Sequence, residues 1–169
     1  RKLIETGWAQ ASVSFFRLTE FDWRREDLLN LLKSSLASKI FPLDETLKLE
    51  RLALARGLTN GKTNWAALSS EPSGPSEIKR MIKFLLDWES LFVSCKHVSE
   101  FRDYFIRWIK SFQFQGLNGA NDATGFTSIE AFFENARRYY HQEDLRTFDS
   151  LSFIREFREV MKNALFSNN

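Results

Sequence analysis

The sequence predicts an all-α fold, an irregular bundle of about seven or eight helices. Apolar residues recur at the three- and four-residue spacing of an amphipathic helix in nearly every segment of the 169-residue chain. Glycine and proline are scarce, with 7 and 3 copies, which suits helices better than a turn-rich β-sandwich. The 17 phenylalanines and 5 tryptophans supply apolar area for a packed core. We therefore expect one helical domain over residues 1–169, with the loop 69–75 as the place for any boundary within it.

Three segments in the first half of the chain have helical apolar spacing. The predicted helices span about residues 12–21, 24–35 and 44–56. Their apolar surface is formed by Phe15, Phe16, Leu18, Leu28, Leu29, Leu31, Leu32, Leu47, Leu49, Leu52, Leu54 and Ala55. Pro42 blocks a continuous helix between the second and third segments. Asp44 is then expected to cap the third helix, and Gly57 to end it in the left-handed conformation.

The second half predicts four more helices. Serine, proline and glycine mark residues 69–75 as a loop, and glycine and asparagine mark 115–126 as another. The helices are expected at about residues 76–94, 99–112, 128–140 and 150–165. The inward side chains of the first two are Ile78, Met81, Ile82, Leu85, Leu86, Leu91, Phe101, Tyr104, Phe105, Trp108 and Ile109.

Composition excludes several functional classes. The chain has 24 basic and 22 acidic residues, closely mixed, so it lacks the net charge of a dedicated nucleic-acid module. No apolar run approaches the roughly 20 residues that a membrane span needs. Cys95 is the one cysteine, which excludes an internal disulfide, fits the cytoplasm and is expected to be a buried thiol. The sequence starts without methionine, so we expect an N-terminus that is processed, tagged or truncated, and a chain that is a fragment of a larger protein.

The sequence also lacks the motifs of common catalytic sites. It has no phosphate-binding GxxxxGK[ST] loop, and the glycines of 116–121 are not followed by the required lysine and hydroxyl residue. His97 and His141 are isolated, so each is interpreted as a surface or capping residue rather than a metal ligand. We therefore expect no metal, no cofactor and no active site in this chain.

Basic residues are the strongest candidates for a binding site. Arg137 and Arg138 precede two tyrosines, and cations beside aromatic rings can hold a single strand by phosphate pairing and base stacking. Arg51, Arg56 and Lys62 form another cluster around the end of the third helix. These five residues are the predicted contacts to a nucleic-acid backbone. The competing interpretation, which applies equally to a cluster at Lys79, Arg80 and Lys83, is a solvated helix face with acidic partners nearby.

One stretch resembles a known family. It consists of DLLNLLKSSL at 27–36, LERLALARGL at 49–58, and then Gly61 and Trp65. This order and spacing are similar to the helical accessory region of AddB/RexB-type subunits of bacterial ATP-dependent helicase–nuclease complexes, which are exonuclease V-like. The match covers about residues 12–65. Arg51 departs from the aromatic or polar residue that is common there, and the last hundred residues match no motif of the family.

The resemblance implies a helical insertion similar to the 2B subdomain of superfamily 1 helicases, bordering the DNA path. It also implies a parent protein with an ATP site and a nuclease motif elsewhere, and a partner helicase–nuclease subunit. Physical reasoning gives the motif an architectural role. Glu50 can accept a bond from Lys33, which would join the second helix to the third, or from the neighbours of Arg51. Trp65 can close the apolar layer over Leu52 and Leu32.

Two functional hypotheses follow. The first is a non-catalytic, cytoplasmic helical domain of a DNA helicase–nuclease subunit in double-strand-break repair and recombination, which positions single-stranded or duplex DNA or packs against the motor domains. The alternative is a helical protein-interaction scaffold with no nucleic-acid role. In that case Phe112, Phe114 and Phe126, around the glycine- and asparagine-rich loop, are expected to be exposed and to dock a partner.

Overall fold

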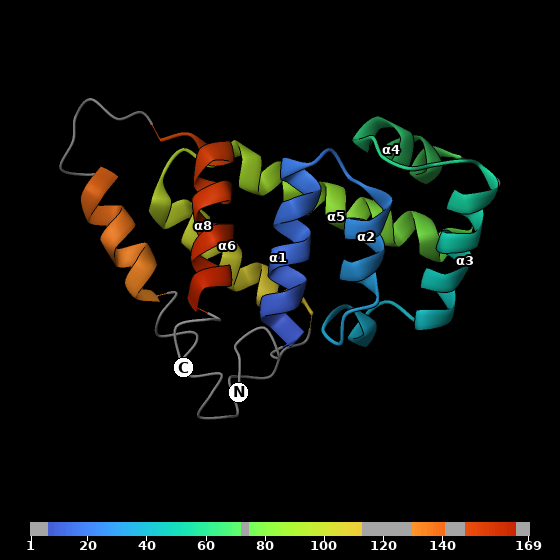
Figure 1. The fold of residues 1–169 in the computed structure, drawn as a ribbon, viewed down its shortest axis with the longest axis horizontal. Helices are drawn as coiled ribbons and strands as arrows, with labels where there is room; N and C mark the ends of the chain where they lie inside the picture. Colours follow the sequence, from blue (N-terminus) through green and yellow to red (C-terminus); the bar gives the residue numbers. More distant parts are fainter. Residues whose placement is uncertain (1–6, 72–74, 113–129, 141–147, 165–169) are drawn as a thin grey trace.

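The computed structural model describes residues 7–71, 75–112, 130–140 and 148–164, and all regular secondary structure within these ranges is helical (Figure 1). The predicted all-α class is therefore confirmed. In chain order the helices are α1 Gly7–Glu20, α2 Arg25–Leu32, the short 3₁₀ helix η2 Ala37–Lys39, α3 Leu43–Ala55, α4 Lys62–Ser70, α5 Ser76–Ser94, α6 Val98–Ser111, a helix over residues 130–140, and α8 Ser150–Ala164.

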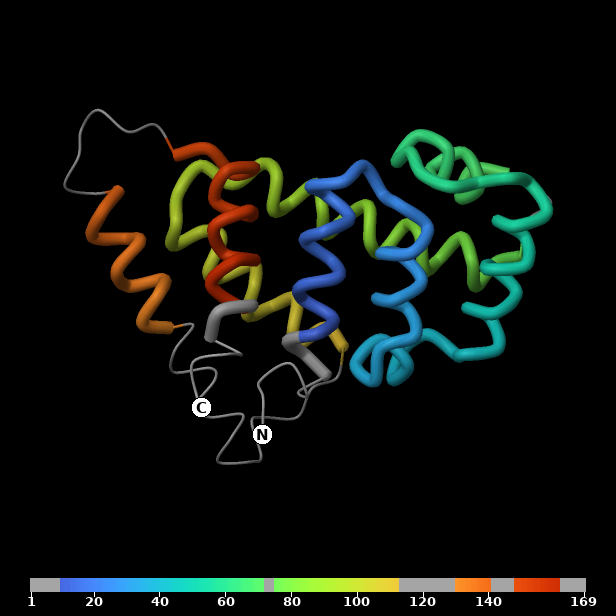
Figure 2. Tube along the Cα trace, in the orientation of Figure 1, coloured from blue at the N-terminus to red at the C-terminus, as the bar shows by residue number. Residues whose placement is uncertain are grey.

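The helices form a row that is crossed by α5. In Figures 1 and 2, α8, α1, α2 and α3 stand side by side, while α5 runs behind them along the length of the molecule. The contacts agree, because α1 packs against both α2 and α8, α2 packs against α3, and α5 touches α3, α4, α6 and α8. The N-terminal helix thus lies inside the row, with the C-terminal helix beside it.

Most helix boundaries fall within a few residues of the predicted ones, and α5 matches its predicted span. The predicted cap of α3 is wrong. Pro42, not Asp44, precedes the helix in extended conformation, and Asp44 lies in the first turn without capping it. Proline lacks an N–H and fixes the chain direction, so the helix begins directly after it. The prediction for Gly57 is confirmed by its φ of +63°.

Two short helices were not predicted from the sequence, η2 and α4. Helix α4 has only Trp65 and Leu68 as buried residues, so it carries no long apolar stripe. A tertiary contact fixes it instead, because the Trp65 indole Nε1 donates to the Trp23 carbonyl at 2.8 Å. Trp65 is fully buried in the core, as its predicted role requires.

Phe16 of α1 is the centre of an aromatic core. Its ring lies 5.2 Å from Phe92 of α5, 5.8 Å from Phe101 of α6 and 5.5 Å from Phe157 of α8, measured between centroids. All four rings are buried. Edge-to-face and stacked rings at these separations attract one another beyond their buried area. One side chain of α1 therefore joins three other helices.

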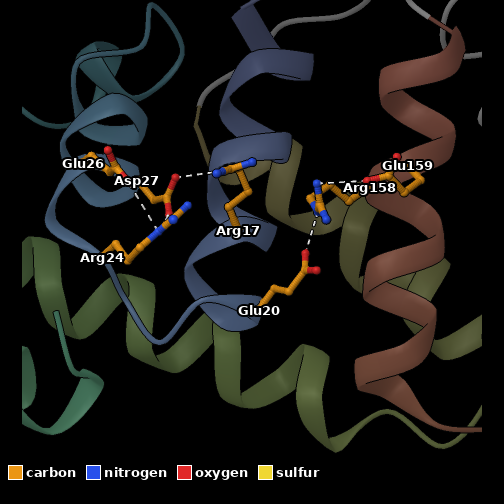
Figure 3. Close-up of polar contacts among 7 residues, drawn as sticks. All are labelled: Arg17, Glu20, Arg24, Glu26, Asp27, Arg158 and Glu159. Carbon is orange, nitrogen blue, oxygen red and sulfur yellow. Dashed lines mark hydrogen bonds and ion pairs between the residues drawn. The ribbon is translucent and has the colours of Figure 1, made fainter.

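Ion pairs join α1 to its two neighbours in the row (Figure 3). Asp27 of α2 is almost fully buried and accepts from Arg17 Nε and Arg24 Nε, both at 2.9 Å. On the other side of α1, Arg158 of α8 is buried and its Nε donates to Glu20 at 2.6 Å. A buried charge without a partner is strongly destabilising, so these pairs favour this one arrangement of α2, α1 and α8.

A further ion pair was predicted from the sequence. Lys33 Nζ lies 2.8 Å from Glu50 Oε2 and joins the end of α2 to the middle of α3. Both side chains are partly exposed, so the pair contributes at most about 1 kcal/mol to stability. Its main effect is to fix how α3 sits beside α2.

We predict that Phe16→Ala lowers the free energy of unfolding by about 4 kcal/mol, because it leaves a cavity between four helices. Urea unfolding followed by circular dichroism measures the change. The control is Leu151→Ala in α8, where the side chain is 52% exposed and a loss of about 1 kcal/mol or less is expected. Equal losses in the two variants would contradict the central position of Phe16.

Candidate nucleic-acid interface

The five basic residues predicted as DNA contacts do not form one surface. Arg51 and Arg56 lie at the end of α3, and Lys62 opens α4. Arg137 and Arg138 lie on the helix over 130–140. These two groups occupy opposite ends of the long axis of the molecule (Figure 1). The fold therefore does not bring all five residues together in one phosphate-binding patch.

At the α3–α4 end, two of the three cations have carboxylate partners. Arg56 donates from Nη1 and Nη2 to the carboxylate of Glu71, and the Nη2 contact measures 3.0 Å. This hydrogen bonding lowers the pKa of Glu71. Lys62 Nζ lies 2.6 Å from Glu89 Oε1. Arg51 is exposed and has no ion pair or hydrogen bond to any residue in the described part of the chain. Arg51 is therefore the cation that remains available here.

Glu89 explains why Lys62 is held in place. The carboxylate is 97% buried on α5, where Thr19 Oγ1 donates to it at 3.1 Å and the Trp23 indole N–H also donates to it. Lys62 supplies the positive charge that such a buried carboxylate needs. The interaction joins α4 to α5 and to the end of α1, so the ammonium of Lys62 has a structural role.

At the other end, Arg137 and Arg138 share one carboxylate. Arg137 Nη2 lies 2.8 Å and Arg138 Nε 3.4 Å from Glu134, and the hydrogen bond from Arg137 lowers the pKa of Glu134. Both arginines remain more than half exposed. Two cations with one anion leave a net positive charge on this face of the helix.

Beside this face lies a hollow of about 420 Å³ with a basic and aromatic lining. Its basic side chains are Lys96 and His97, from the turn between α5 and α6, and Arg137. Tyr140 and Phe148 supply aromatic rings, with centroids 5.5 Å apart. Arg137 and Tyr140 are three residues apart on one helix, which places them on the same face. The fold thus brings together three segments that are distant in the sequence.

The electrostatics of this hollow favour an anion. Helix α6 begins at Val98, so the N–H groups of its first turn and the positive end of its dipole lie among the lining residues. The side chains of Lys96 and His97 are exposed and have no ion pair or hydrogen bond to the described residues. Glu100, the acidic residue of the first turn, is not part of the lining. We call this site the α6 hollow.

Sequence reasoning found part of the α6 hollow. It selected Arg137 and the neighbouring tyrosines. It interpreted His97 as a surface or capping residue, and His97 is indeed exposed at the N-cap position of α6. Lys96 was not selected. The signal that could have found Lys96 is the pair of basic residues, Lys96 and His97, directly before a predicted helix start. Backbone N–H groups at such a position already favour anions.

Other predicted candidates behave as solvated or structural groups. Arg80 pairs with Glu77 at 2.9 Å and Lys83 with Asp87 at 3.3 Å, as expected for a solvated face. Cys95 is buried, and burial raises the pKa of its thiol to about 12, so it is protonated at neutral pH.

The aromatic docking residues of the alternative hypothesis need one correction. Phe112 was expected to be exposed, but it is fully buried and packs edge-on against Trp108. Its side chain continues the aromatic core at the end of α6, so it cannot dock a partner. Phe114, Phe126, His141 and the glycines of 116–121 lie outside the described residues.

Two further properties of the described ranges bear on function. No group of three or more His, Cys, Asp and Glu side chains in these ranges is placed to hold a metal ion. None of the helices there combines the length and apolar character that a membrane crossing requires. Comparison with protein-family models, with curated proteins and with solved structures gives no match to this chain.

We predict that Lys62→Ala lowers the free energy of unfolding by about 1–3 kcal/mol, because Glu89 would stay buried without its cation. Arg51→Ala, in the same predicted cluster but without a partner, is the control and should change stability by less than about 0.5 kcal/mol. Urea denaturation of both variants makes the comparison. If Lys62→Ala were as stable as Arg51→Ala, the structural role of Lys62 would be wrong.

Proposed function

We propose that this chain is a non-catalytic helical domain of an AddB/RexB-type subunit of a cytoplasmic DNA helicase–nuclease, where it helps to position DNA in double-strand-break repair. The observation that carries the DNA role is the α6 hollow, where Lys96, His97 and Arg137 line one space with two aromatic rings. Cations pair with phosphates, and aromatic rings stack on bases. The proposed partners are DNA, the remaining domains of the parent protein and a second helicase–nuclease subunit.

The family part of the proposal rests on the resemblance over residues 12–65. Three positions of that stretch have architectural roles in the structure: Glu50 pairs with Lys33, Gly57 adopts the left-handed conformation, and Trp65 is buried. These contacts give the spacing of the motif a physical reason, because they set how α2, α3 and α4 pack together. They do not bear on DNA, so the α6 hollow and the resemblance are separate lines of support.

The structure orders the five proposed DNA contacts by availability. Arg137 lines the α6 hollow, and Arg138 lies beside it with its guanidinium largely exposed. Arg51 is exposed at the opposite end of the molecule. Arg56 and Lys62 are engaged with carboxylates, so a phosphate would have to compete with those partners. Arg137 and Arg138 share the single carboxylate of Glu134, which leaves one positive charge in excess, so we place the main DNA contact at this pair.

One observation favours the alternative function, a helical interaction scaffold. Leu43 and Leu54 on α3 are 51% and 56% exposed, and they lie about three turns apart, which puts them on the same face. Helix α3 stands at the end of the row, where no further helix of the described chain covers it (Figure 1). An exposed apolar stripe of this kind suits contact with another protein surface. In the first proposal, the same stripe would pack against the motor domains.

We predict that the chain binds fluorescently labelled oligonucleotides with an affinity that falls steeply as salt rises from about 50 to 200 mM, because phosphate pairing releases counterions. Fluorescence anisotropy measures the binding. Arg137→Ala should weaken it several-fold, whereas Lys83→Ala, an exposed cation with its own partner on α5, should not.

Binding that is absent at low salt, or that does not depend on salt, would contradict the DNA role. In that case, the alternative function predicts a different result. Replacing both Leu43 and Leu54 with serine should then abolish self-association or capture of a partner, as measured by light scattering, while the helical circular dichroism spectrum is retained.

A further inference from the structure

We propose that the α6 hollow holds one unpaired nucleotide of a single DNA strand, with its phosphate at Lys96 and His97 and its base against Tyr140 and Phe148. This inference rests on the proposed function and deepens it, because it names the form of DNA that is bound and the orientation of the nucleotide. The hollow, at about 420 Å³, falls within the range of about 300–1,000 Å³ that is typical of pockets for small organic ligands.

The phosphate side of the site is formed by the start of α6. Lys96 and His97 are exposed there and have no carboxylate partner in the described ranges. The first N–H groups of a helix have no acceptor within the helix, and Ser99 of that first turn belongs to the lining. Side-chain cations, backbone donors and the helix dipole therefore favour the same kind of group, an oxyanion.

The base side is formed by the end of the helix over 130–140 and by the residue before α8. The rings of Tyr140 and Phe148 are half-buried, so each is anchored in the protein and part of each remains accessible. Phe153 of the core supports them, with centroids 6.2 Å from Tyr140 and 5.2 Å from Phe148. Such anchored rings stack on a base without needing to be ordered first.

The base side carries an uncharged ring. Burial, followed by the nearby carboxylates of Glu156 and Asp149, raises the pKa of Tyr140, and those two carboxylates favour a neutral base over a phosphate at this side. Arg137 lies one turn before Tyr140 on the same helix and lines the hollow. We assign Arg137 to the phosphate that follows along the strand.

A single strand fits this arrangement better than a duplex. In a duplex both faces of each base are covered by stacking, so the rings of Tyr140 and Phe148 would find no exposed base face. Duplex binding also relies on many phosphate contacts along an extended surface. Most cations at the predicted sites, including Arg56, Lys62 and Arg137, already have carboxylate partners, so the described part of the chain offers few free cations along an extended surface.

The test compares a labelled oligothymidine with a fully paired, blunt-ended duplex of equal length, by anisotropy at several salt concentrations. We expect the oligothymidine to bind about tenfold more tightly, because stacking of one base contributes a factor of this order. Lys96 and Arg137 predict a slope of log affinity against log salt of about −1.4 for a single strand, and Lys96→Ala should reduce its magnitude by about 0.7.

Two further variants separate stacking from charge. Tyr140→Leu should weaken oligothymidine binding about tenfold and leave the salt slope unchanged, while Tyr140→Phe keeps the ring and should bind normally. Lys110→Ala, an exposed lysine in the last turn of α6, is the matched control for Lys96→Ala. Circular dichroism and urea unfolding show that each variant is folded.

The outcomes distinguish this site from the general proposal. If DNA binds but Lys96→Ala and Tyr140→Leu behave like the unmodified chain, this inference is wrong and DNA binds elsewhere on the chain. If the blunt duplex binds as tightly as the oligothymidine, the single-strand assignment is wrong. If neither DNA binds at low salt, both the inference and the proposed function are wrong.

Discussion

The packing of Phe16 is the contact on which the rest of the structure depends. Its ring meets aromatic side chains of α5, α6 and α8, so an N-terminal residue sets the positions of helices from the middle and the end of the chain. Removing such a buried ring costs about 3–5 kcal/mol, a large part of the stability of a typical domain. With α1 held in this way, the pairs Arg17–Asp27 and Arg158–Glu20 fix its neighbours on either side.

This arrangement separates stability from the candidate binding site. The core lies where α1, α5, α6 and α8 meet, while the α6 hollow lies at the start of α6 and is lined by exposed or half-buried side chains. Lys96 and His97 can therefore meet a ligand without disturbing the aromatic core. Lys62 is different, because its ammonium holds the buried Glu89, and a phosphate at that position would compete with the fold itself.

The sequence predicted the candidate site only in part, for a physical reason. Arg137 was found because a cation next to tyrosines is visible as a local pattern. Lys96 was missed because its relevance depends on the helix over 130–140 lying beside the start of α6, a contact between segments about forty residues apart. Likewise, the sequence placed Phe112 on the surface because a predicted loop follows it, whereas the packing of α6 buries it against Trp108.

The sequence by itself determined the all-α class, the span of α5, the left-handed end of α3 at Gly57 and the Lys33–Glu50 pair. These features follow from local periodicity, from the conformational freedom of one glycine and from neighbouring helices joined by a short connection. Only the tertiary structure decided that α4 forms, that Lys62 serves Glu89, and that three distant segments build the α6 hollow. Periodicity shows which face of a helix is buried, but it does not show which helix covers that face.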